Sequence, residues 1–364
     1  MSHDGSWILR SNGQERYFYT RWGALSFDRD LLQGFESLAA FVPLLEELPK
    51  PFLDTWLEGL VVIDADAKRL LYWASQFAEG RPLSVSLFES MITARWPGWT
   101  TSWLLAPALE IVEALPHLAP YARGALEPPE PYPVDQFARD QDQPWEEARG
   151  REDWADFRGS VGARESAECL THHTWVVLDD RSVLIDDGWN CSSLLRSGPP
   201  AVDVIRARPD ALEPPWGHLL DSCYRIDTEH RRIDWWISRP VWVRNPLVAV
   251  AERWPGWSFR PLRAGPPQLA KEMGLDPRAL VRREGIEATL ETVERVLGHR
   301  STGADLLATA LRTITVAPGE RVSVVPPGPG DDGPEEMDVD LRQLAEHILA
   351  EERFQPLEEP TTDG

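Results

Sequence analysis

The sequence predicts an α+β protein of two tandem homologous domains, each a mostly antiparallel sheet with helices packed on it. The main observation is an internal repeat. The pentapeptide Arg-Trp-Pro-Gly-Trp occupies residues 95–99 and returns letter for letter at 253–257. Upstream, one constant spacing matches Ile63-Asp64, Lys68-Arg69-Leu70 and Tyr72-Trp73 with Ile226-Asp227, Arg231-Arg232-Ile233 and Trp235-Trp236. A repeat of roughly 160 residues has the size of a domain, not of a solenoid unit.

The first copy, residues 1–123, reads as strands joined mainly by hairpins, with three helices. Asp28 is placed to cap the first helix, Ala65-Asp66-Ala67-Lys68 is a short polar turn, and Pro97 stops the helix before it. Strands are expected at 7–9, 16–20, 59–64, 70–75 and 99–105, and helices at 28–42, 85–95 and 107–115.

The second copy, residues 161–300, repeats this order. Strands are expected at 173–178, 183–185, 219–227, 233–238 and 257–262, and helices at 246–254 and 268–273. Regular strand–helix alternation is absent, which argues against a doubly wound parallel sheet. The length of 364 residues allows two hydrophobic cores, one for each copy.

Three further segments complete the chain. Residues 124–160 are rich in proline and acids and predict a surface linker, part of which packs because it carries Trp145, Trp154 and Phe157. Residues 301–330 predict a β extension, with a hairpin formed by 311–316 and 321–325. Residues 331–364 predict an acidic tail with an amphipathic helix at 339–353. This helix either docks on the body, which is the favoured interpretation, or awaits a partner.

The net charge of −22 restricts the classes of partner. Binding to a nucleic-acid backbone or to an acidic membrane needs clustered basic surface, so neither is expected. From Glu320 onward, thirteen acids face three arginines. The charge fits either a basic protein partner or simple solubility. The acidic tail is read first as a solvated segment and second as a docking arm for a basic partner.

The cellular setting follows from composition. No apolar run is long enough for a membrane helix, and the N-terminus lacks a signal-peptide pattern. An odd set of three cysteines (Cys169, Cys191 and Cys223) indicates a reducing compartment rather than a disulfide framework. Only three lysines occur beside many arginines, alanines and prolines, which is typical of GC-rich bacterial genomes. We expect a cytoplasmic bacterial protein.

The repeated Trp-Pro-Gly-Trp turn has two interpretations. Paired indoles suit a cation or a sugar face, but a helix stop followed by a sharp reversal itself needs Pro and Gly. We therefore predict a structural role for Trp96, Pro97, Gly98, Trp99, Trp254, Pro255, Gly256 and Trp257.

The candidates for chemistry are weak. Cys169, His172 and Cys191 are of metal-ligand type, but a zinc site needs a second close pair, which is missing. We predict no metal, no cofactor and no catalytic residue. Acids at strand ends, including Asp64 and Asp227, fit turns. Helix capping accounts for Asp28 and Asp30 and leaves Arg29 as a candidate clamp for an anion or a carboxylate. Arg29, Trp22 and Trp189 are the candidate interaction residues.

The resulting hypothesis favours protein binding over catalysis and describes an immunity or inhibitor-type protein. It would present an acidic, tryptophan-rich surface to a basic protein such as a nuclease toxin. One alternative is an enzyme with a Cys/His-containing site in the second copy. Another is a scaffold subunit that recruits partners through its acidic tail.

Overall fold

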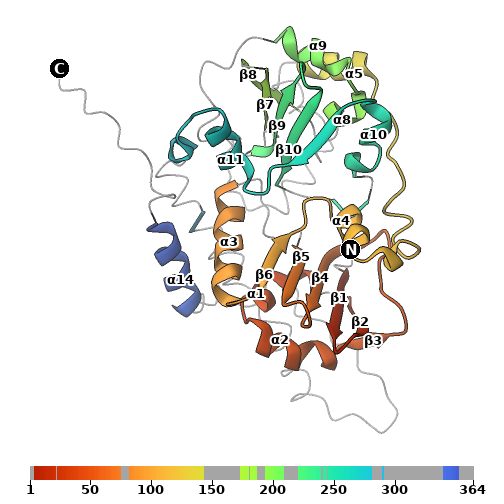
Figure 1. Cartoon of the computed structure of the whole chain (residues 1–364), viewed down its shortest axis with the longest axis vertical. Coiled ribbons are helices and arrows are strands. Elements are labelled where there is room, and N and C mark those ends of the chain that lie inside the picture. Colours follow the sequence, from red (N-terminus) through yellow and green to blue (C-terminus); the bar gives the residue numbers. More distant parts are fainter. Residues whose placement is uncertain are drawn as a thin grey trace, which may run out of the picture.

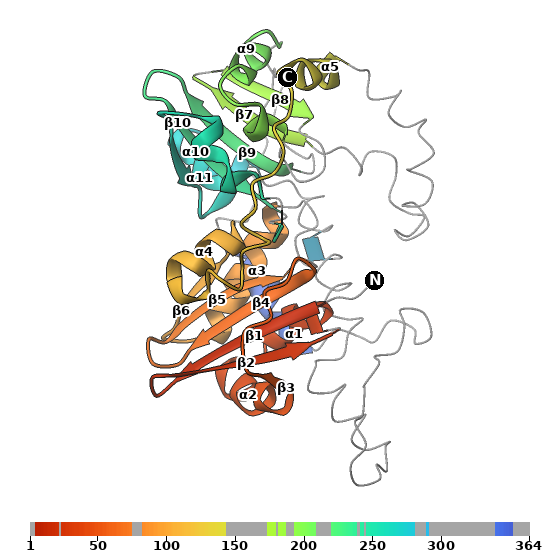
Figure 2. The same cartoon turned by 90° about the vertical axis from the view of Figure 1, so that its right-hand side faces the viewer.

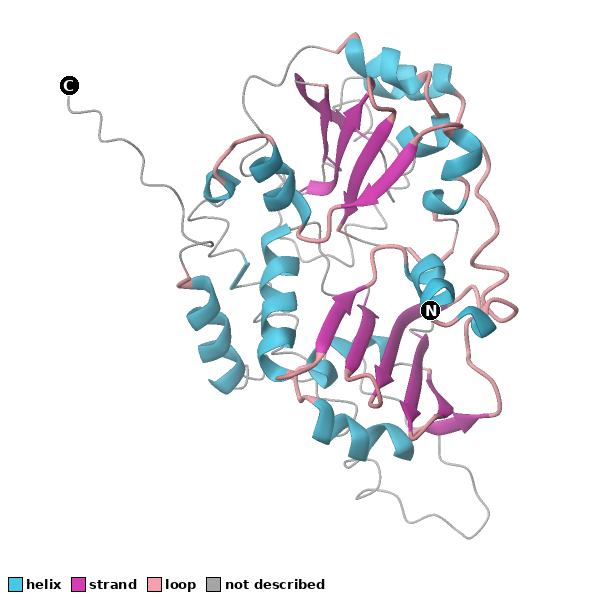
Figure 3. Cartoon of the chain, viewed as in Figure 1, coloured by secondary structure: helices cyan, strands magenta, loops and turns pink. Residues whose placement is uncertain are grey.

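Two mixed β-sheets with helices packed on them form the body of the protein (Figure 1). The computed structural model describes residues 4–21, 23–74, 82–142, 173–179, 181–186, 193–208, 220–238, 241–243, 245–280, 289–290 and 339–351. Helices and strands both contribute throughout (Figure 3), so the α+β class is confirmed. Within the described residues, no helix combines the length and apolarity needed to cross a membrane.

The first sheet has the strand order β3-β2-β1-β4-β5-β6. Its strands are β1 (Asp4–Ser11), β2 (Gln14–Thr20), β3 (Glu46–Leu48), β4 (Leu57–Asp64), β5 (Arg69–Ala74) and β6 (Thr100–Trp103). The helices α1 (Phe27–Leu31), α2 (Phe35–Phe41), α3 (Pro82–Arg95) and α4 (Pro107–Ala114) complete what we call the first module.

The second sheet has the order β11-β10-β9-β7-β8. Its strands are β7 (His173–Leu178), β8 (Arg181–Asp186), β9 (Leu220–Asp227), β10 (Arg232–Ile237) and β11 (Ser258–Pro261). The helices α8 (Ser193–Ser197), α9 (Ala201–Arg206), α10 (Val250–Arg253) and α11 (Gly265–Glu272) complete the second module.

Both sheets pair their strands by the same scheme, apart from the additional edge strand β3. An antiparallel hairpin is followed by a parallel pair, a second antiparallel hairpin and a second parallel pair. Both sheets are therefore mixed. The first has three antiparallel pairs and two parallel ones, and the second has two of each, so the expected antiparallel majority holds only in the first. Helical connections return β4, β6, β9 and β11 parallel to a neighbour.

The predicted helix at 28–42 is interrupted. Gly34, at φ 79°, separates α1 from α2, and a Cβ at this position would lie 3.0 Å from the carbonyl oxygen of Arg95. Gly198 follows α8 with φ 75° and has the same relation to the Arg253 carbonyl. Only glycine combines this backbone conformation with such a close approach.

Two further local predictions need correction. The N-cap of α1 is Ser26, whereas Asp28 and Asp30 lie inside the helix and are buried. The helix predicted at 246–254 is a 3-10 turn, Pro246–Val248, followed by the single turn α10. Asn245 caps the 3-10 turn by accepting the Leu247 amide at 3.0 Å, so the regular helix starts late.

The two tryptophan corners have matching geometry. Trp96 Nε1 donates to the Leu31 carbonyl at 2.8 Å, and Trp254 Nε1 donates to the Leu195 carbonyl at 2.8 Å. Each indole also meets the second tryptophan of its corner edge-to-face at 5.0 Å. Gly98 and Gly256 make the reversals at φ 77° and 78°. Each corner thus ties the helix that precedes β6 or β11 to an earlier helix, at the last residue of α1 or at the middle residue of α8.

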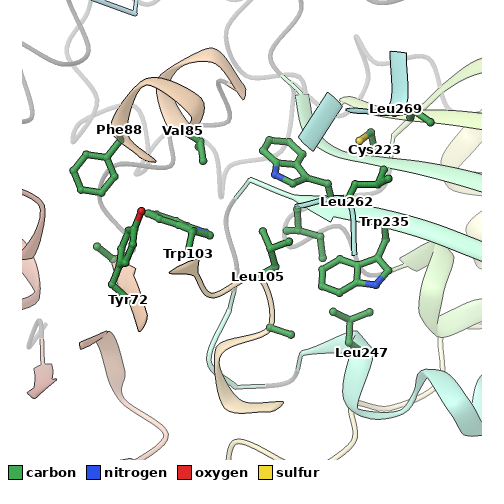
Figure 4. Packing of buried hydrophobic residues seen from close by; sticks show 14 of the residues in the cluster. Tyr72, Val85, Phe88, Trp103, Leu105, Cys223, Trp235, Leu247, Leu262 and Leu269 are labelled. Carbon is green, nitrogen blue, oxygen red and sulfur yellow. The ribbon is translucent and has the colours of Figure 1, made fainter. Parts of the chain in front are cut away.

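The modules share one apolar core, so the expectation of two separate cores is wrong. The main cluster of buried side chains runs from the first sheet into the second. Leu105, just before α4, lies between Trp103 on one side and Trp235, Leu247 and Leu262 on the other (Figure 4). The two views, which differ by a 90° rotation, both place α4 between the two sheets (Figures 1 and 2).

The second module also covers the opposite face of the first sheet, which we call the outer face. A smaller cluster of buried residues lies there under α4, and it includes Trp242 from the second module. The Trp242 indole stacks on Trp73 with 6.0 Å between ring centroids. Two contacts on opposite faces of one sheet therefore hold the modules together.

Segments outside the modules also pack. Helix α5 (Val134–Asp142) lies in the predicted linker and buries Phe137 near α8 and α9. Helix α14 (Val339–Leu349) packs on α3, as expected for the tail helix, and buries Leu341, Ala345, Ile348 and Leu349. Trp145, Trp154, Phe157 and the hairpin at 311–325 lie outside the described residues.

Replacing Trp254 by Phe should lower the free energy of unfolding by about 2–4 kcal/mol, because the Leu195 carbonyl loses its donor and a gap forms. Urea unfolding followed by circular dichroism measures the change. Trp257→Phe is the matched control, since that side chain is half-buried, and it should lose less than half as much. Equal losses would contradict the role assigned to the hydrogen bond.

Ile348→Ala should destabilise the protein by about 2–4 kcal/mol, because α14 would lose a buried contact with the body. The exposed Gln343 on the same helix provides the control. Gln343→Ala should stay within about 0.5 kcal/mol in thermal unfolding. A neutral Ile348→Ala would show that α14 does not dock in solution.

Candidate functional site

Most of the candidate site residues predicted from the sequence lie outside the described part of the chain. Cys169, His172, Cys191, Trp22 and Trp189 lie outside the described residues. Arg29 is half-buried on α1. Among the described residues, no group of three or more His, Cys, Asp or Glu side chains is arranged to hold a metal.

The described cysteine and the duplicated acids have structural surroundings. Cys223 is buried on β9, and burial raises the pKa of its thiol, which opposes a nucleophilic role. Asp64 accepts the Ala67 amide and Asp227 accepts the His230 amide, both at 2.9 Å. These two acids close the hairpin turns, in line with the predicted turn chemistry.

The clearest exposed feature is an aromatic surface beside β2 on the outer face of the first sheet. We use this name for Tyr17, Tyr19, Phe52, Trp56 and Tyr121. Trp56 is 74% exposed and Tyr121 is 43% exposed. Isolated apolar side chains on a surface are common, but a tryptophan with this exposure is typical of binding residues.

The pleat of β2 orients the two tyrosines. Phe18 points into the main core and is fully buried, so its neighbours Tyr17 and Tyr19 face the other way. The Tyr19 ring packs on Phe52 with 4.6 Å between centroids. Tyr17 packs against the smaller apolar cluster. Tyr121 is close enough to Tyr17 to contribute to the raised pKa of the Tyr17 phenol.

A tight turn projects Trp56 from the body. The Leu57 amide donates to the Asp54 carbonyl at 3.1 Å, which closes a four-residue turn with Trp56 near its corner. Leu53 and Leu57 on either side are buried and anchor the turn. A Cβ at Gly124 would lie 3.0 Å from the Thr55 methyl, so this turn contacts the segment that carries Tyr121.

Carboxylates border the aromatic surface. Tyr19 Oη donates to Asp4 at 2.7 Å, and Tyr17 Oη donates to Glu15 at 3.2 Å. Glu15 also lies 2.7 Å from His117 Nε2. Burial raises the pKa of both phenols, and the neighbouring carboxylates add to the effect. Both tyrosines therefore stay protonated as hydrogen-bond donors, leaving the negative charge on the acids.

The charges around this surface are of both signs. Arg21 lies near Tyr19 and opposes the rise of its pKa. Glu46 acts on Tyr19 in the opposite sense, and Asp54 is exposed beside Trp56. Local charge at the aromatic surface is thus mixed, with several carboxylates close to the rings.

A second polar cluster distinguishes the modules. On the second sheet, Asp234 is fully buried and binds Arg260 at 2.9 and 2.7 Å. Arg260 also binds Glu272 at 2.6 Å, and Arg225 lies 3.7 Å from that carboxylate. In the second sheet, Asp234 stands opposite Arg225 on one neighbouring strand and Arg260 on the other. In the first sheet, Leu71 stands in the same way between Val62 and Ser102. The ion pairs join α11 to its sheet.

Comparison with protein-family models, with curated proteins and with solved structures finds no match.

Sequence reasoning did not find Trp56. The chain has 17 tryptophans, and composition does not separate exposed indoles from buried ones. The available signal was local: Trp56 follows Asp54-Thr55, a turn-forming pair, and precedes a buried strand.

Trp56→Ala should change the free energy of unfolding by less than about 1 kcal/mol, because its indole is mostly in water. Trp73→Ala should lose about 3–5 kcal/mol, because that indole is buried against Trp242. Chemical denaturation of both variants checks the contrast. A large loss in Trp56→Ala would mean that the side chain packs on the body in solution.

Proposed function

We propose that this protein binds a basic protein partner through the aromatic surface, in the manner of an inhibitor or immunity protein. The supporting observation is Trp56, which is 74% exposed on an anchored turn. A rigid, exposed aromatic side chain gives large contact area at low entropic cost, and tryptophan is enriched among residues that dominate binding.

The neighbouring acids favour a cationic partner. An indole attracts a guanidinium or ammonium group through its ring face. Asp54 and Glu15 supply carboxylates near the rings. An arginine-bearing loop of the partner could contact both kinds of group.

Long-range attraction would come mainly from other parts of the chain. Residues 124–160 carry ten acids against four arginines, and the stretch from Glu320 onward carries thirteen against three. Such charge raises association rates with a basic protein and loses its effect as salt increases. We assign contact to the aromatic surface and steering to these acidic segments.

The same proposal includes an origin and a location. We infer that the modules descend from one duplicated domain; their common strand pairing and matching tryptophan corners support this origin. We place the protein in a reducing bacterial cytoplasm, on the strength of its cysteine usage and arginine-rich composition.

The test uses the full chain and the purified product of the adjacent gene, since inhibitors are commonly encoded beside their targets. Trp56→Ala and Tyr121→Ala should each raise the Kd at least about tenfold in calorimetry. Leu44→Ala is the matched control, because Leu44 is 63% exposed but lies outside the aromatic surface. It should leave the Kd within about twofold.

Two outcomes would overturn the proposal. One is the absence of any complex at both low and high salt. The other is a complex whose Kd responds equally to Trp56→Ala and Leu44→Ala, since binding would then involve another surface. Slower association at high salt, with little change in dissociation, would support the steering role of the acidic segments.

A further inference from the structure

The two sheets differ at one edge. In the first sheet, β3 pairs antiparallel with β2 and covers the outer side of the β1–β2 hairpin. In the second sheet, β8 takes the place of β2, and among the described residues it pairs only with β7. The second sheet therefore ends at the strand where the first sheet continues.

The edge of β8 is also the longest of the four sheet edges in the described chain. β3 has three residues, β6 and β11 have four each, and β8 has six. β11 ends in Pro261, which has no amide to donate to a further strand. Short strands and prolines are common means of protecting a sheet edge, and β8, with Val183-Leu184-Ile185 at its centre, has neither.

The turns of the two hairpins determine which amides point outward. Both turns have two residues, at 12–13 and 179–180, and they are flanked by the pairs Ser11–Gln14 and Leu178–Arg181. In such a hairpin the flanking pair exchanges hydrogen bonds, and the direction of the amides alternates along each strand from there.

The first sheet shows the result of this alternation. Tyr17 lies three residues after Gln14, and it pairs with Leu48 of β3. Leu184 lies three residues after Arg181, so its amide points toward the edge of the second sheet. The amide of Ser182 points the same way, because it lies two residues from Leu184.

The described helices near β8 lie on the two faces of its sheet. Figure 1 shows α5 and α8 on one side of the second sheet and α11 on the other. Val183 and Ile185 are buried in the main core, and Ser182 Oγ accepts Trp175 Nε1 at 3.0 Å. These contacts fix the strand and leave its outer amides available to another strand.

The charge around β8 selects the kind of strand that fits. Residues 179–187 contain four aspartates and one arginine, Arg181, which donates to the carbonyls of Arg206 and Arg208 at 2.8 Å. A second copy of the chain would bring the same aspartates against their own kind, on a body of net charge −22. Lysine or arginine on the added strand would instead complement them.

We propose that the edge of β8 binds an extended, basic segment of a protein partner, which adds to the second sheet as β3 adds to the first. Main-chain hydrogen bonds with Ser182 and Leu184 supply affinity, and the aspartates supply the preference for basic residues. In the first sheet, charge supports the added strand in the same way, since Arg16 of β2 binds Glu47 of β3 at 2.9 and 2.7 Å. This contact is separate from the aromatic surface, so either can fail without the other.

A defined peptide tests this edge on the full chain at 0.15 M salt. The probe is the end-blocked hexapeptide Lys-Val-Thr-Val-Arg-Val, and NMR measures amide hydrogen exchange in the unmodified protein. On saturation, exchange at Ser182 and Leu184 should slow at least about tenfold. The control peptide Lys-Pro-Thr-Pro-Arg-Pro has the same charge but fewer amides, and it should give no such protection.

A pair of variants tests the position. Leu184→Lys should raise the Kd of the probe at least about tenfold, because it places a positive charge on the edge. Ala40→Lys makes the same change of charge at an exposed site of the first module and should keep the Kd within about twofold.

Three results would overturn the inference. Slow exchange at Ser182 and Leu184 before any peptide is added would mean that this chain already covers the edge. Protection that grows with protein concentration would assign the edge to a second copy. Equal binding of the proline peptide would show that charge alone attracts the probe.

Discussion

Each module depends on one buried indole hydrogen bond. Trp96 reaches Leu31 at the end of α1, and Trp254 reaches Leu195 in the middle of α8; each acceptor lies three residues before a glycine, Gly34 or Gly198. In both modules this bond joins an earlier helix to the helix that leads into the final strand. The glycine that follows α1 or α8 allows the close approach, since a side chain there would meet the backbone of Arg95 or Arg253. The repeated pentapeptide therefore supplies the donor of a hydrogen bond whose acceptor is the carbonyl of Leu31 or Leu195.

The modules differ in what covers their outer faces. In the first, Val62 and Leu71 form an apolar surface that receives Trp242 from the second module. In the second, Arg225 and Asp234 occupy the paired positions. Ion pairs at such sites are weak evidence for stability, because burying their charges offsets much of their attraction. The apolar pair on the first sheet thus receives a side chain of the second module, whereas the charged cluster on the second sheet binds Glu272 of α11.

The strands were predictable where a short apolar run lies beside a polar turn, as at 59–64 and 233–238, where the structure has β4 and β10. Strand direction was not, because it depends on where the intervening helices return the chain. Asp28 resembled a cap because helix starts favour acids, yet Ser26 occupies that position and Asp28 is buried. The aromatic surface was hidden for a different reason: whether Trp56 is exposed depends on the turn closed by Asp54 and Leu57, which amino-acid composition does not encode.

The contacts of Trp242 and Leu105 have a consequence for biosynthesis. The ribosome completes the first module before Trp242 leaves the exit tunnel, so Trp73 is synthesised long before its stacking partner. Leu105 likewise awaits Trp235 and Leu262. During this interval the nascent chain exposes apolar surface around Trp73 and around Leu105. Exposed hydrophobic surface of this kind is what molecular chaperones bind. The order of translation thus leaves Trp73 and Leu105 without their packing partners until the second module has been synthesised.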